Sequence, residues 1–177
     1  NTGGKLTVTF PKSVGQIELN FPFKPGSHGA QPHSGPNGSG ATRVIGELYP
    51  FGFGLSYTTF AYSDLEVSPL QQHNTQGEYT IKVNVTNTGK RAGDEVVQLY
   101  VRDKVSSVIT YDSQLRGFER VSLQPGETRQ VTFSLKPEDL QILDRNMNWT
   151  VEPGEFEVMI GASSQDIRLK KTITALP

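Results

Sequence analysis

Three histidines, His28, His33 and His73, have the widest chemical range in this chain, because an imidazole can bind a metal or transfer a proton near neutral pH. All three lie in stretches whose composition is typical of loops. No HxH or HExxH pattern gives any of them a second ligand at metal-binding spacing. We therefore predict no metal site and interpret the histidines as solvated loop residues.

Carboxylates are the next candidates, because paired Asp and Glu side chains can perform general acid–base catalysis. Asp64 and Glu66 share one face of an expected strand, opposite to Leu65 and Val67, and so should face solvent. An acid catalyst instead needs an apolar pocket that raises its pKa. The chain also has no cysteine, no GxSxG motif and no P-loop lysine beside the glycine-rich residues 35–40. We predict no catalytic residue and no cofactor.

Composition excludes further classes of function. The formal net charge is −1 over 177 residues, so bulk electrostatics favour neither nucleic acid nor an anionic membrane surface. The sequence contains no run of about 18 apolar residues, which is the length that a membrane-spanning helix needs. The length suits one domain with an appendage.

The elements expected after residue 57 are short strands. Apolar residues alternate with polar ones in EYTIKVNV (78–85), and DEVVQLYVRD (94–103) is apolar on both faces, as in a central strand. Turn signals recur at intervals of roughly 8–12 residues, without a helical period longer than one turn. The sequence predicts an all-β fold, a two-sheet antiparallel sandwich of the immunoglobulin or fibronectin type III-like kind with an extended N-terminal arm. Further strands are expected near residues 65–67, 114–123, 131–135, 156–160 and 167–173.

Trp149 is the only tryptophan, and its place before Val151 and the Pro153-Gly154 turn favours a core position. The alternative, an exposed platform for a ligand, stays open.

Before residue 57 the chain has a different character. Residues 5–10 and 14–21 are predicted to be extended strands, and residues 25–40 have the Gly, Pro and Ser content of a flexible connector. The stretch LYPFGFGLSY (48–57) then alternates rings with glycines, which a regular strand tolerates poorly. So much apolar surface requires a packing partner.

Five collinear segments carry a resemblance. They are GGKLTVTFPKSVGQIELNF, ELYPFGFGLSYTTFAYSDL, VTNTGKRAGDEVVQLYVRD, LRGFERVSLQPGETRQVTFSL and WTVEPGEFEVMIGASSQDIRL. In this order they resemble the C-terminal part of glycoside hydrolase family three enzymes of the β-glucosidase type. The resemblance implies terminal strands of a truncated α/β-sandwich domain at 1–24, a linker and aromatic neck at 25–56, and a fibronectin type III-like domain at 57–177.

The resemblance also implies a function and partners. In this family the nucleophile lies in a (β/α)₈ barrel and the acid/base residue in the main part of the α/β-sandwich domain, neither of which is in this chain. We therefore expect a non-catalytic accessory part of a retaining exo-β-glycosidase, periplasmic or extracellular in a bacterium, whose partners are those catalytic domains and whose parent hydrolyses a β-linked glucoside or oligosaccharide. Whether the chain is an enzyme by itself is left undecided, although it lacks the catalytic residues. The alternative is an independent carbohydrate-binding or adhesion module of the same fold.

Two sets of site residues follow from this comparison. Tyr49, Phe51, Phe53 and Tyr57 are predicted to form a neck that packs against the catalytic domains. The connector is either a strap docked on those domains or a simple tether, and both alternatives remain open. As a strap it would border the sugar pocket with four residues: His28, His33, Asn37 and Arg43.

Overall fold

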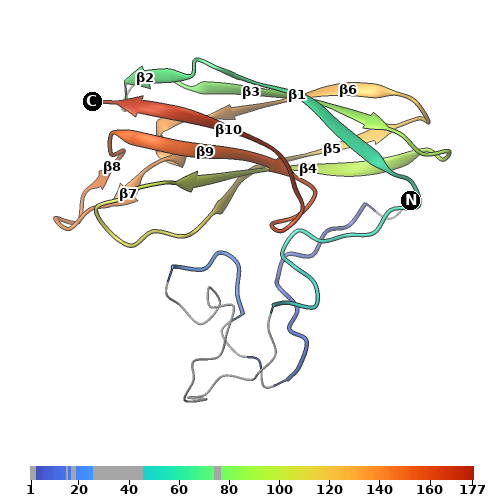
Figure 1. Ribbon diagram of the computed structural model, residues 1–177, viewed down its shortest axis with the longest axis horizontal. Coiled ribbons are helices and arrows are strands. Elements are labelled where there is room, and N and C mark those ends of the chain that lie inside the picture. Colours follow the sequence, from blue (N-terminus) through green and yellow to red (C-terminus); the bar gives the residue numbers. More distant parts are fainter. Residues whose placement is uncertain (1–2, 15, 17–18, 26–45, 74–76) are drawn as a thin grey trace.

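The computed structural model describes residues 3–14, 16, 19–25, 46–73 and 77–177. Two packed sheets form the body, and the N-terminal arm lies beneath the larger sheet, on the side away from the smaller one (Figure 1). The only helical element in the described part of the chain is one 3₁₀ turn, η2 (Pro137–Asp139). The predicted all-β sandwich is confirmed.

A three-stranded antiparallel sheet has the order β1-β3-β6, and a five-stranded sheet has the order β2-β10-β9-β4-β5, with β2 parallel to β10. A third, two-stranded sheet pairs β7 with β8. The strands are β1 (Phe60–Ser68), β2 (Gln71–His73), β3 (Tyr79–Asn87), β4 (Gly93–Asp103), β5 (Gln114–Leu123), β6 (Thr128–Leu135), β7 (Ile142–Leu143), β8 (Trp149–Thr150), β9 (Gly154–Gly161) and β10 (Ile167–Leu176). Each strand expected after residue 57 is present, and His73 lies in β2 rather than in a loop.

The core lies between the two main sheets and follows the alternation in the sequence. In β3, Ile81, Val83 and Val85 are completely buried, while the residues between them are partly exposed. β4 is buried on both faces, since Val97 and Leu99 belong to the core and Gln98 and Tyr100 are also covered. The apolar character of β4 on both faces therefore has a structural cause: something covers its outer face.

The N-terminal arm, by which we mean the described residues before β1, covers the outer face of β4. Residues 3–10 run antiparallel to residues 48–54, with hydrogen bonds from the Leu6 N–H to the Phe53 carbonyl (2.8 Å) and from the Phe10 N–H to the Tyr49 carbonyl (2.9 Å). The pairing amounts to a single bridge, Phe10–Tyr49. The strands predicted at 5–10 and 14–21 are therefore wrong over the described residues. Pro50 has no N–H to donate, and Gly52 has a φ of 79°, so a regular ladder cannot continue.

Candidate functional site

The neck makes specific contacts with the outer face of β4. The Gln98 side-chain amide donates to the Gly52 carbonyl (3.1 Å) and to the Ala162 carbonyl (2.7 Å). The Ser164 N–H donates to the Phe51 carbonyl (2.9 Å). A backbone segment held by such directed bonds is part of the sandwich unit rather than a loose appendage.

Aromatic packing reinforces this attachment. The ring of Phe51 stacks on that of Phe21 at 4.7 Å, and Phe21 in turn meets the edge of Tyr100 at 5.6 Å. Burial raises the pKa of Tyr100, whose hydroxyl donates to the Gln98 side-chain oxygen. Part of the apolar surface of the neck is thus covered by its own chain.

An ion pair fixes the beginning of the arm. Lys5 Nζ lies 2.9 Å from Glu95 Oε1, and the two side chains are only 18% and 9% exposed. Such a pair is costly to break, because one partner would leave the other charge buried and uncompensated. The arm and the sandwich therefore behave as one unit at this end.

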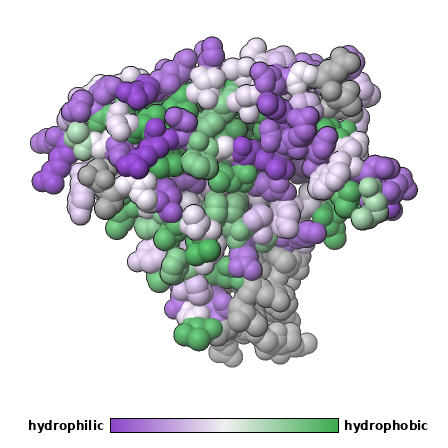
Figure 2. Space-filling view, turned by 180° about the vertical axis from the view of Figure 1, so that it is seen from behind, coloured by the Kyte–Doolittle hydropathy of each residue, from purple (hydrophilic) through white to green (hydrophobic). Residues whose placement is uncertain are grey.

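The other side of the arm is exposed. Tyr49 stacks on Phe53 at 5.0 Å and is 41% exposed, and Tyr57 is 71% exposed. We call the exposed large apolar residues of the arm, taken together, the outer arm surface: Val8, Phe10, Val14, Leu48, Tyr49, Leu55 and Tyr57. Apolar side chains also gather in the lower, narrower half of the molecule in the space-filling view (Figure 2). The four predicted neck residues therefore divide: Phe51 is turned to the sheet, Phe53 is partly buried, and Tyr49 and Tyr57 are turned toward solvent.

The predicted pocket-border residues, His28, His33, Asn37 and Arg43, lie outside the described residues. Among those described, no group of three or more His, Cys, Asp or Glu could hold a metal ion. His73 Nδ1 lies 2.7 Å from the oxygen of Pro177. None of the helical structure seen in the described ranges is long and apolar enough to cross a bilayer.

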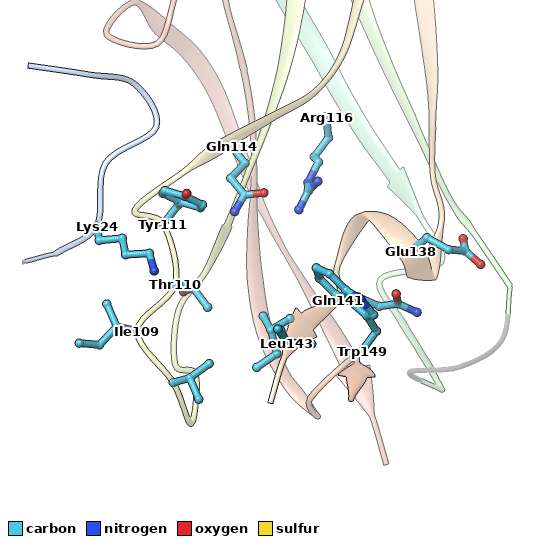
Figure 3. Close-up of a pocket in the computed structure, with 12 residues that line it drawn as sticks. Lys24, Ile109, Thr110, Tyr111, Gln114, Arg116, Glu138, Gln141, Leu143 and Trp149 are labelled. Carbon is cyan, nitrogen blue, oxygen red and sulfur yellow. The ribbon is translucent and has the colours of Figure 1, made fainter. Parts of the chain in front are cut away.

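A groove of about 750 Å³ opens at one end of the sandwich (Figure 3). We call it the Trp149 groove. It lies between the β4–β5 loop, the start of β5 and the β7–β8 sheet, and its lining includes Tyr111, Gln114, Arg116, Gln141 and Trp149.

Trp149 is 68% exposed, so the prediction of a core position is wrong. Val151, two residues later, is buried, but β8 is only two residues long and the alternation does not extend back to Trp149. Trp149 pairs instead with Leu143 in the small β7–β8 sheet, outside the two main layers. Sequence alternation missed this because it assumes one continuous strand.

Hydrogen bonds fix both walls of the groove. In the β7–β8 turn, Asp144 Oδ1 accepts from the N–H groups of Asn146 and Asn148, both at 2.8 Å. In the β4–β5 loop, the Ser107 N–H donates to the Glu152 carboxylate at 2.8 Å. These side-chain-to-backbone bonds order the turn and the loop on either side of the groove.

The arm also contacts this loop. The Asp112 N–H donates to the Phe23 carbonyl (2.9 Å), and Lys24 Nζ lies 5.5 Å from the centre of the Tyr111 ring. The same chain segment that covers β4 therefore also supports the groove.

Two partly buried charged groups lie close to this end of the sandwich: Arg116 lines the groove, and Asp103 lines a small neighbouring cavity that Arg116 also borders. Burial lowers the pKa of Arg116, and burial, assisted by the nearby Glu152, raises the pKa of Asp103. Arg116 Nε and Asp103 Oδ2 are buried and have no hydrogen-bond partner within the described part of the chain. Buried polar atoms are normally hydrogen-bonded, so these two unpaired atoms are exceptions that need an explanation.

Comparisons with known proteins show which family this chain resembles. Residues 95–164 match the fibronectin type III-like domain family. A β-xylosidase of Formosa agariphila is 45% identical over 176 residues, covering 96% of this chain and 23% of that protein. A periplasmic β-glucosidase of Salmonella typhimurium is 40% identical, covering 95% of this chain and 22% of that protein.

A solved structure agrees with these matches. A β-glucosidase from Erythrobacter marinus has a TM-score of 0.86 and 37% identity, and the match covers 98% of this chain and 22% of that one. The chain thus spans about a fifth of the length of these relatives. The chain belongs to glycoside hydrolase family three, as the C-terminal part that carries the fibronectin type III-like domain of its members.

Proposed function

We propose that this chain is the non-catalytic accessory part of a retaining exo-β-glycosidase that removes terminal non-reducing β-D-glucosyl residues. Its role is to stabilise the (β/α)₈ and α/β-sandwich domains of the same protein. The names of the relatives support the reaction class. A periplasmic or extracellular location is part of the proposal, supported by the name of the Salmonella relative.

The outer arm surface is the observation that carries this proposal. An exposed apolar patch on a well-anchored segment usually marks an interface. Here the anchoring is specific, through Lys5 and Glu95 and through Gln98 and Gly52. Covering one Leu or aromatic side chain contributes roughly 1.5–3 kcal/mol. Several such side chains on one surface would bind the catalytic domains firmly.

The connector residues His28, His33, Asn37 and Arg43 stay a prediction, as borders of the sugar pocket of the parent enzyme. Their alanine variants in the parent would raise KM for a nitrophenyl β-glucoside if the connector is a docked strap. If the connector is a tether, the variants would leave KM unchanged.

Charge placed on the outer arm surface tests the accessory role. The double variant Val8→Glu/Leu48→Glu should lower the melting temperature of the parent enzyme by several degrees, because charges would enter the domain interface. The isolated chain should be unaffected, since both side chains are exposed in it. Val105→Glu is the matched control, because Val105 is also exposed but lies outside the arm.

An unchanged parent, or equal destabilisation of the isolated chain, would contradict the proposed interface. Hydrolysis of a nitrophenyl β-glucoside by the isolated chain would contradict the non-catalytic role. Binding of 1-anilinonaphthalene-8-sulfonate gives a third measure, since the isolated chain should bind more dye per mole than the same surface does in the parent.

A further inference from the structure

We propose that the Trp149 groove binds a β-linked oligosaccharide, with one sugar ring packed on the indole of Trp149. The choice of a β-linked sugar rests on the proposed function, since a parent that acts on β-glycosides meets chains of such sugars. The existence of the binding groove rests on the geometry alone.

Trp149 has the properties of a stacking platform. Its indole is 68% exposed, yet its backbone is held by the pairing with Leu143 and by the tight turn around Asp144. Rigid exposed aromatic side chains lose little conformational entropy when a ligand covers them. In a β-linked pyranose chain with equatorial substituents, the ring faces carry C–H groups, which suit the electron-rich face of an indole.

The polar lining matches the hydroxyl groups at the edge of a sugar. Gln114 and Gln141 are half-buried at the groove, and each side-chain amide offers donors and an acceptor side by side. Thr110 adds a hydroxyl group that can both donate and accept. In Figure 3, Gln114 and Arg116 extend in the same direction from β5, with Trp149 and Gln141 on the β7–β8 side.

Arg116 adds a charged donor to the lining of the groove. Its Nε is buried without a partner among the described residues, although the side chain lines the groove. That atom is covered, so a ligand would meet the guanidinium only through the part of the side chain that lines the groove. A guanidinium is also planar and presents several donors in fixed directions, which suits neighbouring hydroxyl groups.

The volume and charge of the groove favour a neutral ligand of this size. Its volume of about 750 Å³ lies within the usual range for small-molecule sites. The charged lining residues have both signs, with Lys24 and Arg116 opposed by Glu138. No single sign predominates to select an anion or a cation.

The only tryptophan of the chain gives a direct test. The isolated chain is titrated with cellotetraose and with xylotetraose while the emission of Trp149 is recorded, and maltotetraose, which is α-linked, serves as the ligand control. We expect a blue shift and protection from acrylamide quenching with at least one β-linked sugar, saturating at about millimolar concentration. The two β-linked sugars distinguish a glucan ligand from a xylan ligand.

Variants measured by calorimetry locate the binding. Trp149→Ala should weaken the affinity at least about tenfold, as removal of a central aromatic side chain does. Gln114→Ala should weaken it several-fold. Phe118→Ala is the matched control, because Phe118 is 67% exposed but does not line the groove, and its variant should bind normally. Circular dichroism checks that each variant is folded.

Three results would overturn the proposal: no response to either β-linked sugar at about 20 mM, undiminished binding by Trp149→Ala, or an equal response to maltotetraose. A Trp149 emission that is already blue-shifted and protected in the free chain would also overturn it. None of these outcomes affects the outer arm surface, which the Val8→Glu/Leu48→Glu variant tests separately.

Discussion

Gly52→Ala is the most informative single change for the attachment of the arm. Gly52 has a φ of 79°, and its carbonyl accepts from the Gln98 side chain. A β-carbon added there would lie 2.1 Å from Gln98 Oε1 and 2.9 Å from the Tyr100 hydroxyl oxygen. Both neighbours are almost completely buried, so neither can move aside into solvent.

Two costs add up in this variant. The left-handed backbone conformation costs a residue with a β-carbon roughly 1–2 kcal/mol. Displacing Gln98 also breaks its bonds to the carbonyls of Gly52 and Ala162, at about 1 kcal/mol each. The expected total is about 3–4 kcal/mol, which corresponds to a fall in melting temperature of roughly 6–16 °C at 2–4 °C per kcal/mol.

Gly126→Ala is the matched control. Gly126 has a φ of 77°, but an added β-carbon would find no atom within 4 Å. This variant incurs only the backbone cost of about 1–2 kcal/mol. The difference between the two variants therefore measures the contact between the neck and β4.

Thermal unfolding and limited trypsin digestion together give the assay. If the arm and the sandwich unfold as one unit, Gly52→Ala lowers the melting temperature well below that of Gly126→Ala. If the arm detaches first, the melting temperature falls less, but cleavage after Lys5 and Lys12 becomes faster. Equal melting temperatures and equal cleavage in both variants would refute the inferred attachment.

Two further predictions concern the same end of the sandwich. Lys5→Ala should lower the free energy of unfolding by about 2–3 kcal/mol in a denaturant titration, because it leaves Glu95 buried without its partner. The control Lys104→Ala breaks an exposed pair with Glu155 and should lower it by under about 1 kcal/mol. Similar losses in the two variants would contradict a special role for Lys5. Tyr62→Phe should stabilise the chain by up to about 1 kcal/mol at pH 7, because it removes a buried hydroxyl that has no partner among the described residues. Burial, with a contribution from Glu95, raises the pKa of Tyr62 above its unfolded value near 10. The wild type therefore loses more stability than the variant as the pH rises above about 10, although both also lose stability through Tyr79 and Tyr100, whose pKa values burial raises as well. A stability difference that stays constant from pH 7 to 11 would argue against this assignment.

Much of the sandwich could be predicted from local sequence, because each strand has its own evidence in the alternation of side chains. The Ile81, Val83 and Val85 pattern requires one buried face whichever sheet receives it. The family resemblance similarly depended on collinear motifs and not on spatial contacts. Strand alternation and collinear motifs can both be recognised without knowing which residues lie next to one another in space.

The arm and the groove could not be predicted in this way, because their positions depend on distant partners. The rings of Phe21 and Phe51 meet each other and Tyr100 only after the chain has folded back across β4. Read alone, the sequence predicted a strand around Phe21 and a neck around Phe51 that packs against other domains, and neither prediction contains the contact with β4. Which rings face the sheet and which face solvent depends on that docking.

Trp149 shows the same limit in a single residue. Its sequence neighbours predicted a core strand, yet a two-residue strand paired with Leu143 holds the indole outside both main sheets. Sequence alone determined the long strands of the two main sheets, since alternation is a local property of the chain. Tertiary structure alone decided which apolar side chains stay exposed, because burial is a property of what lies opposite in space.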